Sequence, residues 1–169
     1  MLSLLFAASL VSHQTPSPSD VDTEDHLLAA LYDVISGPAG KERDWNRMRS
    51  LFAKDASMAV AFERQNGEVR DFEFNVEKYI QLSGPELLKK GFYEHEIGRR
   101  SERFGHIEQV FSSYESRYDP KDPKPFERGV NALQLFFDGK RWWIRTIIWE
   151  GETPKLKLPG SLLRRSEVH

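Results

Sequence analysis

One short segment, residues 93–99, carries the side chains best suited to acid–base chemistry. Tyr93, His95 and Arg99 alternate with other residues on one side of an expected strand. A histidine with an ordinary pKa can act as a base near neutral pH, while tyrosine can donate a hydrogen bond and arginine can hold an anion. We therefore take His95, Tyr93 and Arg99 as candidate catalytic residues. The alternative, which we favour, is that His95 is a half-buried strand residue bonded to a neighbour, because the sequence offers it no paired partner.

A second set of polar residues is expected to line a ligand pocket. Asn131 and Thr146 oppose each other across a predicted hairpin if Asp138-Gly139 forms a two-residue turn. They are the polar exceptions on an apolar face, so they either bind a ligand or satisfy each other as a cross-strand pair. The other candidate ligand-binding residues are Trp45, Gln109, Ser113 and Trp142.

No sequence pattern indicates a metal or a cofactor. The five histidines are scattered, without His-x-His or His-Glu-x-x-His spacing. The chain has no cysteine, so a thiolate metal site, a disulfide and a thiol nucleophile are excluded. Gly-x-Ser-x-Gly and a phosphate-binding glycine loop are also missing from the sequence. We therefore predict no metal site and no cofactor.

Length and composition predict one folded domain. The chain has 169 residues, of which 39% are hydrophobic and 12% aromatic, enough for a compact core. Its 24 basic and 26 acidic residues give a formal net charge of -2. Basic stripes that would follow a nucleic-acid backbone are not found, so we expect no nucleic-acid partner.

The amino terminus resembles an export signal. Leu2–Val11 is apolar but too short to span a bilayer, and a linker rich in proline and serine follows it. We expect residues 1–20 to be a signal peptide and linker, residues 21–152 the folded domain and residues 153–169 a tail. The protein would then be secreted or periplasmic. No basic residue precedes the apolar run, so the alternative is that this segment is an ordinary amino terminus without a signal peptide. The protein would then be cytoplasmic.

The positions of helix and turn signals predict an α+β domain. Apolar residues at helical spacing indicate helices over about 23–36 and 42–53, and a third helix begins after Asn75 with a break at Ser83–Glu86. Hairpin turns are indicated at Asn66-Gly67, around Gly105 and at Asp138-Gly139. This order favours helices packed on one face of a bent, mainly antiparallel sheet.

The last hairpin, residues 129–150, is predicted to have two unlike faces. A four-residue loop over Asp138–Arg141 would slide the partners of a two-residue loop but keep the same faces. One face is apolar and carries Leu133, Leu135, Trp142 and Ile144. The other mixes aromatic and basic side chains and carries Trp143, Arg145, Ile147 and Trp149. The second face suits a partner subunit or a polar-lined cavity.

Three segments resemble one known superfamily. They are Asp44-Trp-x-x-Met-x-x-Leu-Phe-x-x-Asp-Ala56, the run from Phe104-Gly-His-Ile107 to Val110–Glu115, and Asp138-Gly-Lys-Arg-Trp-Trp-Ile144. Together they are similar to nuclear transport factor 2-like domains, the superfamily that includes SnoaL-like proteins and ketosteroid isomerase. The resemblance covers about residues 22–152. It implies a cone-shaped sheet with three helices on its concave face, a pocket inside the cone, and a homodimer through the outer face with Trp143, Arg145 and Trp149.

The resemblance leaves three functions open, because this fold supports many activities. The first is a SnoaL-like pocket protein that binds a small, largely apolar ligand. The second is a cofactor-free isomerase, dehydratase or hydrolase with His95 as general base and Tyr93 or Arg99 stabilising negative charge. The third is an assembly module whose own side chains fill the cone. The catalytic sets of ketosteroid isomerase and of the related epoxide hydrolases do not align with this chain, so no catalytic residue is carried over.

Overall fold

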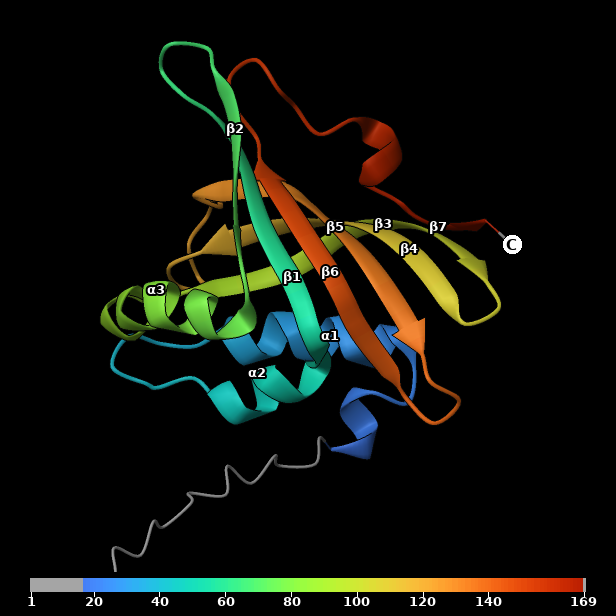
Figure 1. Cartoon of the computed structure of the whole chain (residues 1–169). Coiled ribbons are helices and arrows are strands. Elements are labelled where there is room, and N and C mark those ends of the chain that lie inside the picture. The colour runs from blue at the N-terminus through green and yellow to red at the C-terminus, as the bar shows by residue number, and fades with distance from the viewer. Residues whose placement is uncertain (1–16, 169) are drawn as a thin grey trace, which may run out of the picture.

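The computed structural model describes residues 17–168, and the leader Leu2–Val11 lies outside them. The elements follow in the order η1 (Pro18–Asp20), α1 (Glu24–Ile35), α2 (Trp45–Leu51), β1 (Phe52–Glu63), β2 (Val69–Phe74), α3 (Val76–Lys89), β3 (Tyr93–Phe104), β4 (Ile107–Arg117), β5 (Glu127–Phe137), β6 (Trp142–Gly151), η2 (Gly160–Leu162) and β7 (Arg165–Val168). The three α-helices lie on one side of a curved sheet (Figure 1). The predicted α+β class is confirmed.

The described strands form one sheet in the order β2-β1-β6-β5-β4-β3-β7. Neighbours are antiparallel except for two parallel pairs, β1 with β6 and β3 with β7. The mainly antiparallel cone expected from the sequence is therefore confirmed. The segment expected as a tail adds the short edge strand β7, which pairs with residues 99–102 of β3.

Each α-helix begins at a side-chain cap. Thr23 accepts a hydrogen bond from the backbone N–H of His26, and Asn75 accepts one from that of Lys78. Such caps satisfy backbone donors that have no partner within the first helical turn. Asp44 caps α2 in the same way. The predicted starts at Thr23 and Asn75 are confirmed.

The expected break of the third helix at Ser83–Glu86 is wrong, because α3 continues through Pro85 to Lys89. A proline inside a helix removes one backbone donor, and packing can offset that loss. Leu87 is buried here, and the ring of Trp45 lies over Gly84, where an added Cβ would be 3.4 Å from Trp45 Cζ2. Trp45 of α2 thus packs on α3 before the proline, and Leu87 is buried after it.

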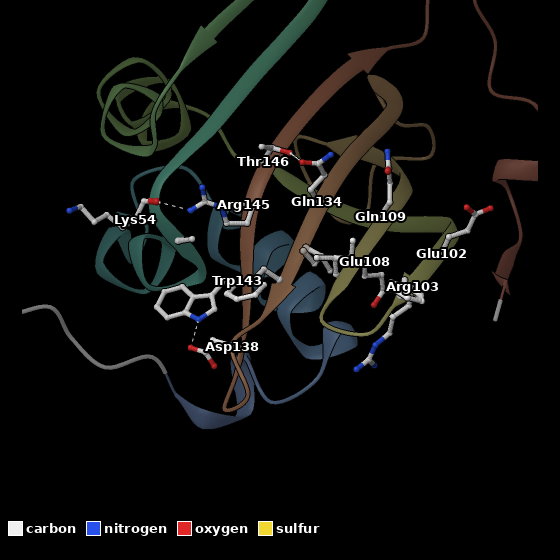
Figure 2. Close-up of a pocket in the computed structure, with 15 residues that line it drawn as sticks. Lys54, Glu102, Arg103, Glu108, Gln109, Gln134, Asp138, Trp143, Arg145 and Thr146 are labelled. Atoms are coloured by element: carbon white, nitrogen blue, oxygen red, sulfur yellow. Dashed lines mark hydrogen bonds between the residues drawn. The ribbon is translucent and has the colours of Figure 1, made fainter.

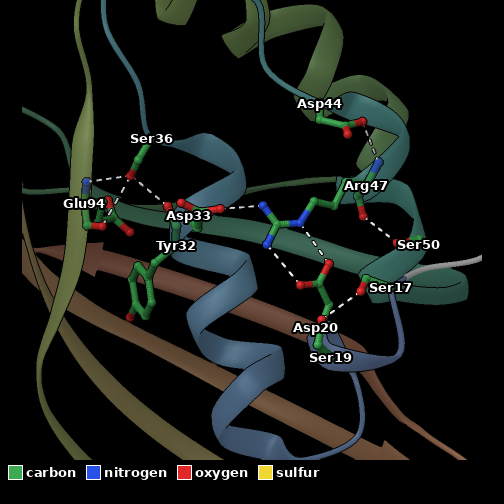
Figure 3. Close-up of polar contacts among 10 residues, drawn as sticks. All are labelled: Ser17, Ser19, Asp20, Tyr32, Asp33, Ser36, Asp44, Arg47, Ser50 and Glu94. Carbon is green, nitrogen blue, oxygen red and sulfur yellow. Dashed lines mark hydrogen bonds and ion pairs between the residues drawn. The ribbon is translucent and has the colours of Figure 1, made fainter.

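A polar network around Arg47 connects the amino-terminal elements η1, α1 and α2. Arg47 of α2 donates from Nε and Nη2 to the two carboxylate oxygens of Asp20, at 2.8 and 3.0 Å. Its remaining nitrogen pairs with Asp33 of α1 (Figure 3). One guanidinium thus links η1, α1 and α2. Its planar set of N–H donors can bind two carboxylates at fixed angles, whereas the single ammonium group of a lysine cannot.

The β5–β6 hairpin has the four-residue loop, Asp138–Arg141. Phe137 lies opposite Trp142, and the Asp138 carboxylate accepts from the backbone N–H groups of Lys140 and Arg141 at 2.8 and 2.9 Å. Gly139 has φ of 91°, a conformation that glycine adopts without strain. The two-residue alternative is therefore wrong and the four-residue alternative is correct.

A β-bulge in β6 corrects the predicted faces of that hairpin. Leu135 pairs with Ile144, but Gln134 pairs with Thr146, so one extra residue stands between them. An extra residue reverses the facing of every later side chain. Ile147 is accordingly 6% exposed and Ile148 is 42% exposed. Beyond the bulge the predicted assignment is wrong, including that of Trp149, which packs edge-on against Phe74 and Tyr79 on the helix side.

The core lies between α1, α2 and the inner face of the sheet. It includes Leu27, Leu28, Leu51, Leu133 and Ile144, all fully buried. Between residues 17 and 168, no helix combines the length and apolar character needed for a membrane span.

Candidate functional site

A cavity of about 420 Å³ opens inside the cone, between α1, α3 and the inner face of the sheet. Its apolar wall includes Leu31, Ile35, Met48, Met58 and Ile147. Polar side chains enter it from three adjacent strands: Glu94 of β3, Tyr114 and Ser116 of β4, and Glu127 and Asn131 of β5. An apolar wall with a few convergent polar groups is the usual construction of a small-molecule site.

Glu94 is a titratable group of this cavity whose pKa is shifted into the neutral range. Ser116 Oγ donates to its Oε2 at 2.8 Å, and the side chain of Asn131 is a second hydrogen-bond partner. Burial raises the pKa of Glu94 from 4.5 to about 7, and the nearby charge of Glu127 adds to the rise. The carboxyl can therefore take up and release a proton near neutral pH.

The backbone of Glu94 is fixed by the end of α1. Ser36 Oγ accepts from the Glu94 N–H at 3.0 Å and contacts its carbonyl oxygen at 3.3 Å (Figure 3). Ser36 also donates to the carbonyl of Tyr32 at 2.7 Å. Because these contacts join α1 to β3, the helix sets the position of the carboxyl in the cone.

A chain of hydrogen bonds runs from Asn131 to Glu96, and each group in it donates to the next. Ser112 donates its only hydroxyl proton to Glu96, so the Tyr32 hydroxyl, 2.6 Å from Ser112 Oγ, must donate to Ser112. Tyr32 in turn accepts from Asn131 Nδ2 at 3.1 Å. Arg99 holds Glu96 at the far end, with Nε 2.9 Å from Oε2. The chain therefore fixes the Asn131 amide with its nitrogen toward Tyr32.

Tyr114 forms the second polar wall of the cavity. Its hydroxyl donates to Glu127 Oε1 at 2.7 Å, and burial together with this carboxylate raises the pKa of Tyr114. The ring lies directly over Gly129, where an added Cβ would be 2.6 Å from the hydroxyl oxygen. The lack of a side chain at Gly129 leaves room for the hydroxyl end of Tyr114 against β5.

The candidate catalytic residues are not gathered as the sequence predicted. The register of β3 shifts between Glu96 and Gly98, so Glu94 and Glu96 face inward before the shift and Arg99 after it. The His95 side chain is 55% exposed, with Nε2 2.9 Å from Glu115. Tyr93 and His95 border a separate groove beside α1 and are not part of the cone lining. The predicted inward set of Tyr93, His95 and Arg99 is thus wrong except for Arg99, which pairs with Glu96 and Asp25.

The candidate ligand-binding residues fall into two groups. Asn131 lines the cone cavity. Trp45 packs on Gly84, and Trp142 is buried in the core beside Phe137, so neither lines the cavity. The expected pairing of Asn131 with Thr146 is wrong, because the bulge turns Thr146 outward and Asn131 pairs with Trp149.

The remaining candidates belong to the opposite face of the sheet. Gln109 and Thr146 line a groove of about 1030 Å³ there, together with Trp143 and Arg145 (Figure 2). Thr146 Oγ1 lies 3.3 Å from Gln134 Oε1, and Arg145 donates to the carbonyl of Lys54 at 2.9 Å. Ser113, on β4 like Gln109, is buried with no hydrogen-bond partner for its hydroxyl.

The outer groove is larger than the cone cavity, and exposed apolar side chains form part of its lining. Its rim includes Phe104, which is 84% exposed, and the exposed side chains of Ile107 and Phe136. Its Trp143 donates to Asp138 at 2.7 Å, and this bond is the main cause of the lowered pKa of Asp138. The groove lining also includes Glu108, a buried carboxyl whose pKa is raised by burial. The exposed apolar side chains of this groove suit contact with another surface.

Sequence reasoning missed Glu94, Glu96 and Tyr32 as site residues. The alternation of the two glutamates along β3 was visible, but the side that they face depends on where α1 packs. Within residues 17–168, histidine and acidic side chains form no group of three or more suited to hold a metal ion.

Comparison with known proteins finds likeness in structure only. No protein-family model and no curated protein matches the chain. Among solved structures, a candidate calcium/calmodulin-dependent kinase II association domain from Exiguobacterium sibiricum has a TM-score of 0.51 and 14% identity, over 78% of this chain and 96% of that one.

Two further structures illustrate the range of similar proteins. An NTF2-like protein of unknown function from Methylobacillus flagellatus has a TM-score of 0.48 and 10% identity, over 78% of this chain and 95% of that one. A candidate ketosteroid isomerase from Kribbella flavida has a TM-score of 0.44 and 16% identity, over 85% and 88%. The nuclear transport factor 2-like fold that the sequence predicts is confirmed by the order of helices and strands, and the likeness to the Exiguobacterium sibiricum domain extends to the fold alone.

Proposed function

We propose that the cone binds a small, largely apolar molecule whose single polar head group lies against Glu94 and Asn131. The observation that carries this proposal is the hydrogen-bonded carboxyl of Glu94 at an apolar cavity of about 420 Å³. A volume of this size falls in the range of small-molecule sites, roughly 300–1,000 Å³. A module that served assembly alone would have no need for open space at this carboxyl.

The walls separate the two parts of such a ligand. Leu31, Met48 and Ile147 offer apolar contact to its body, while Asn131 and Ser116 surround the carboxyl that would meet its head. Burying an apolar body yields about 25 cal/mol for each Å² removed from water, so the body supplies affinity and the head supplies orientation.

Native mass spectrometry of freshly purified protein tests this proposal. We expect a co-purified small molecule on the wild type. Ser83→Trp places a large ring from α3 into the cavity and should remove the adduct, whereas Gln81→Trp, on an exposed position of the same helix, should retain it. An adduct that persists in Ser83→Trp would place the ligand elsewhere and contradict the proposal.

The second candidate function is proton transfer by a cofactor-free isomerase, dehydratase or hydrolase. It is favoured by one observation, the pKa of Glu94 near 7, which is suited to a general base at neutral pH. Glu94 replaces His95 in this role, because His95 lies outside the cone lining.

Isomerisation of cyclohex-3-enone to its conjugated isomer would test the second candidate. Glu94→Gln should reduce turnover by at least about 100-fold, the usual contribution of a positioned base, while His95→Gln should leave it unchanged. Equal loss in both variants, or no loss in Glu94→Gln, would remove Glu94 from the mechanism.

We further propose that the chain forms a homodimer through the outer face of the sheet. Exposed apolar side chains gather there, including Phe104, Ile107 and Phe136, beside Trp143 and Arg145 (Figure 2). Trp149, which the sequence assigned to this face, is not part of it. Patches of this kind are uncommon on proteins that stay monomeric.

Export remains a proposal from the sequence alone. If Leu2–Val11 is a signal peptide, the protein recovered after expression with its native amino terminus will lack the leader. Intact mass measurement distinguishes the cleaved from the uncleaved chain.

A further inference from the structure

We propose that the head group selected by the cone is a protonated amine, so that the ligand is an organic cation with an apolar body. This inference rests on the proposed binding function and narrows it to one chemical class. Three features of the cavity support it: the charge of its lining, its ring surfaces, and the direction of its hydrogen bonds.

The charge of the lining is predominantly negative. Glu94 and Glu127 reach the cavity from β3 and β5, and Glu86 lies on α3 at an exposed position of the lining. Among the described lining residues, Lys90 is the only basic one; it is exposed, with Nζ 5.9 Å from the centre of the Tyr118 ring. Carboxylates at an apolar cavity attract a cation and repel an anion, and the low local dielectric strengthens both effects.

Aromatic rings supply much of the remaining wall. Tyr79 and Trp149 meet edge-on, with centroids 6.4 Å apart, and Tyr118 stacks on Phe126 at 4.1 Å. All four rings line the cavity, as do those of Phe92 and Tyr114. The negative face of an aromatic ring attracts ammonium groups, and rings combined with carboxylates are the usual surroundings of a bound organic cation.

The hydrogen bonds near Glu94 leave acceptors rather than donors for a ligand. Ser116 already donates to Glu94, Asn131 Nδ2 donates to Tyr32, and Tyr114 donates to Glu127. A carboxylate or phosphate head group at Glu94 would therefore find the donors of Ser116, Asn131 and Tyr114 engaged within the protein. An ammonium group brings its own donors, and the Glu94 carboxylate can accept from it.

The affinity for a cation should depend on pH through Glu94. The titratable or charged groups that face this carboxyl are Tyr32 of α1, Tyr79, Glu86 and Lys90 of the α3 region, Tyr114 of β4 and Glu127 of β5. Because the raised pKa of Glu94 is about 7, the carboxyl is largely neutral at pH 6 and largely charged at pH 8. Cation binding should therefore strengthen as pH rises through 7.

Three probes with one rigid body test the inference by isothermal titration calorimetry at pH 6 and pH 8: 1-adamantylamine, 1-adamantanol and 1-adamantanecarboxylate. At pH 8 we expect the amine to bind about tenfold more tightly than the alcohol, with the carboxylate weakest. At pH 6 the advantage of the amine should shrink. Tightest binding of the alcohol or the carboxylate would overturn the inference while leaving the proposed binding function standing.

Glu94→Gln is the matched variant, since it keeps the shape and the bond from Ser116 but removes the charge. It should bind amine and alcohol alike, whereas His95→Gln, outside the cone lining, should behave as the wild type. Should Glu94→Gln not fold, Glu127→Gln removes a second negative charge from the cavity lining, at an exposed residue. It should also reduce the preference for the amine. Failure of all three probes to bind folded wild-type protein at millimolar concentration would overturn the binding function and the inference together.

Discussion

Glu94 is a carboxyl for which ionisation in the folded state is costly. Its partners, Ser116 and Asn131, satisfy its oxygens, yet burial beside Glu127 still raises its pKa to about 7. In the unfolded chain the same group titrates near 4.5. The folded state therefore holds this proton more tightly than the unfolded state, so Glu94 makes a pH-dependent contribution to stability.

Glu94→Gln should remove that dependence. The contribution of the wild-type carboxyl is complete below about pH 4.5 and is lost as pH rises through about 7. At pH 8 the variant should be more stable than the wild type by up to about 3 kcal/mol, an upper bound because the side chain is only partly buried. Urea unfolding at pH 5.5 and pH 8 measures the change.

Glu86→Gln, at an exposed position of α3, serves as the control and should change stability little at either pH. Equal pH dependence of wild type and Glu94→Gln would show that another group is responsible.

At the scale of elements, α1 ends on a buried arginine rather than on a glycine cap. Arg43 Nε donates to the carbonyl of Ile35 at 2.9 Å, and Nη2 donates to that of Gly37 at 2.8 Å. Its Nη1 donates to the carbonyls of Pro38 and Lys41. One side chain thus satisfies the carbonyls at the end of α1, close to the Ser36 that fixes Glu94.

Arg43→Lys should destabilise the protein by about 2 kcal/mol although it keeps the charge. A lysine cannot donate to four carbonyls arranged around a planar fork, and buried carbonyls without partners are costly. Arg49→Lys is the control, because Arg49 forms an exposed pair with Glu77 and should cost less than about 1 kcal/mol. Thermal unfolding compares the two; equal effects would contradict the role of Arg43.

The carboxy-terminal segment, whose strand β7 pairs with β3, also makes a close backbone contact with the sheet at Gly98. An added Cβ at Gly98 would overlap the carbonyl oxygen of Leu162 in η2, and the Arg99 N–H donates to the carbonyl of Arg164 at 3.1 Å. This contact depends on a residue without a side chain, in a bulged part of β3.

Gly98→Ala should detach this segment from β3 while the rest of the domain stays folded. Limited proteolysis should then cut within residues 153–164 at least tenfold faster than in the wild type, because local opening exposes the backbone. Gly160→Ala is the control, since nothing lies within 4 Å of a Cβ built there. Unchanged cleavage of Gly98→Ala would mean that the contact does not hold the segment.

For the whole molecule, the curved sheet divides two kinds of surface. The inner face encloses the cavity and its carboxyl, and the outer face carries the groove of about 1030 Å³ with exposed apolar side chains. Because the cavity lies on the inner face of the sheet, a dimer formed through the outer face would leave the cavity open to ligands.

Phe136→Asp should convert the proposed dimer to monomer. Phe136 lies in the outer groove, and a charge at an apolar interface without a partner is costly enough to weaken association by at least about 100-fold. Sedimentation velocity at micromolar concentration measures the change, with Val69→Asp, an exposed residue of β2, as control. A wild type that sediments only as monomer would contradict the dimer.

The sequence by itself determined the three helices, the cap at Asn75 and the fold class, and for the first helix it left Asp22 and Thr23 as alternative caps. These depend on local rules: apolar periodicity, capping side chains and turn residues act over a few neighbouring positions. The resemblance of short segments such as Asp138–Ile144 then sufficed for the cone. Asn131 could be predicted as a pocket residue because it is a polar exception on an apolar strand face.

Only the tertiary structure decided which side chains share the cavity. A register shift within β3 puts His95 and Arg99 on opposite sides, and another in β6 reverses the facing of Thr146 and Trp149. His95, Thr146 and Trp149 therefore lie on the sides opposite to those predicted. A bulge forms where packing and pairing across strands favour it, and no local pattern marks the position. The pKa of Glu94 likewise depends on burial by α1, α3 and β5, which are distant in sequence and meet only in the folded cone.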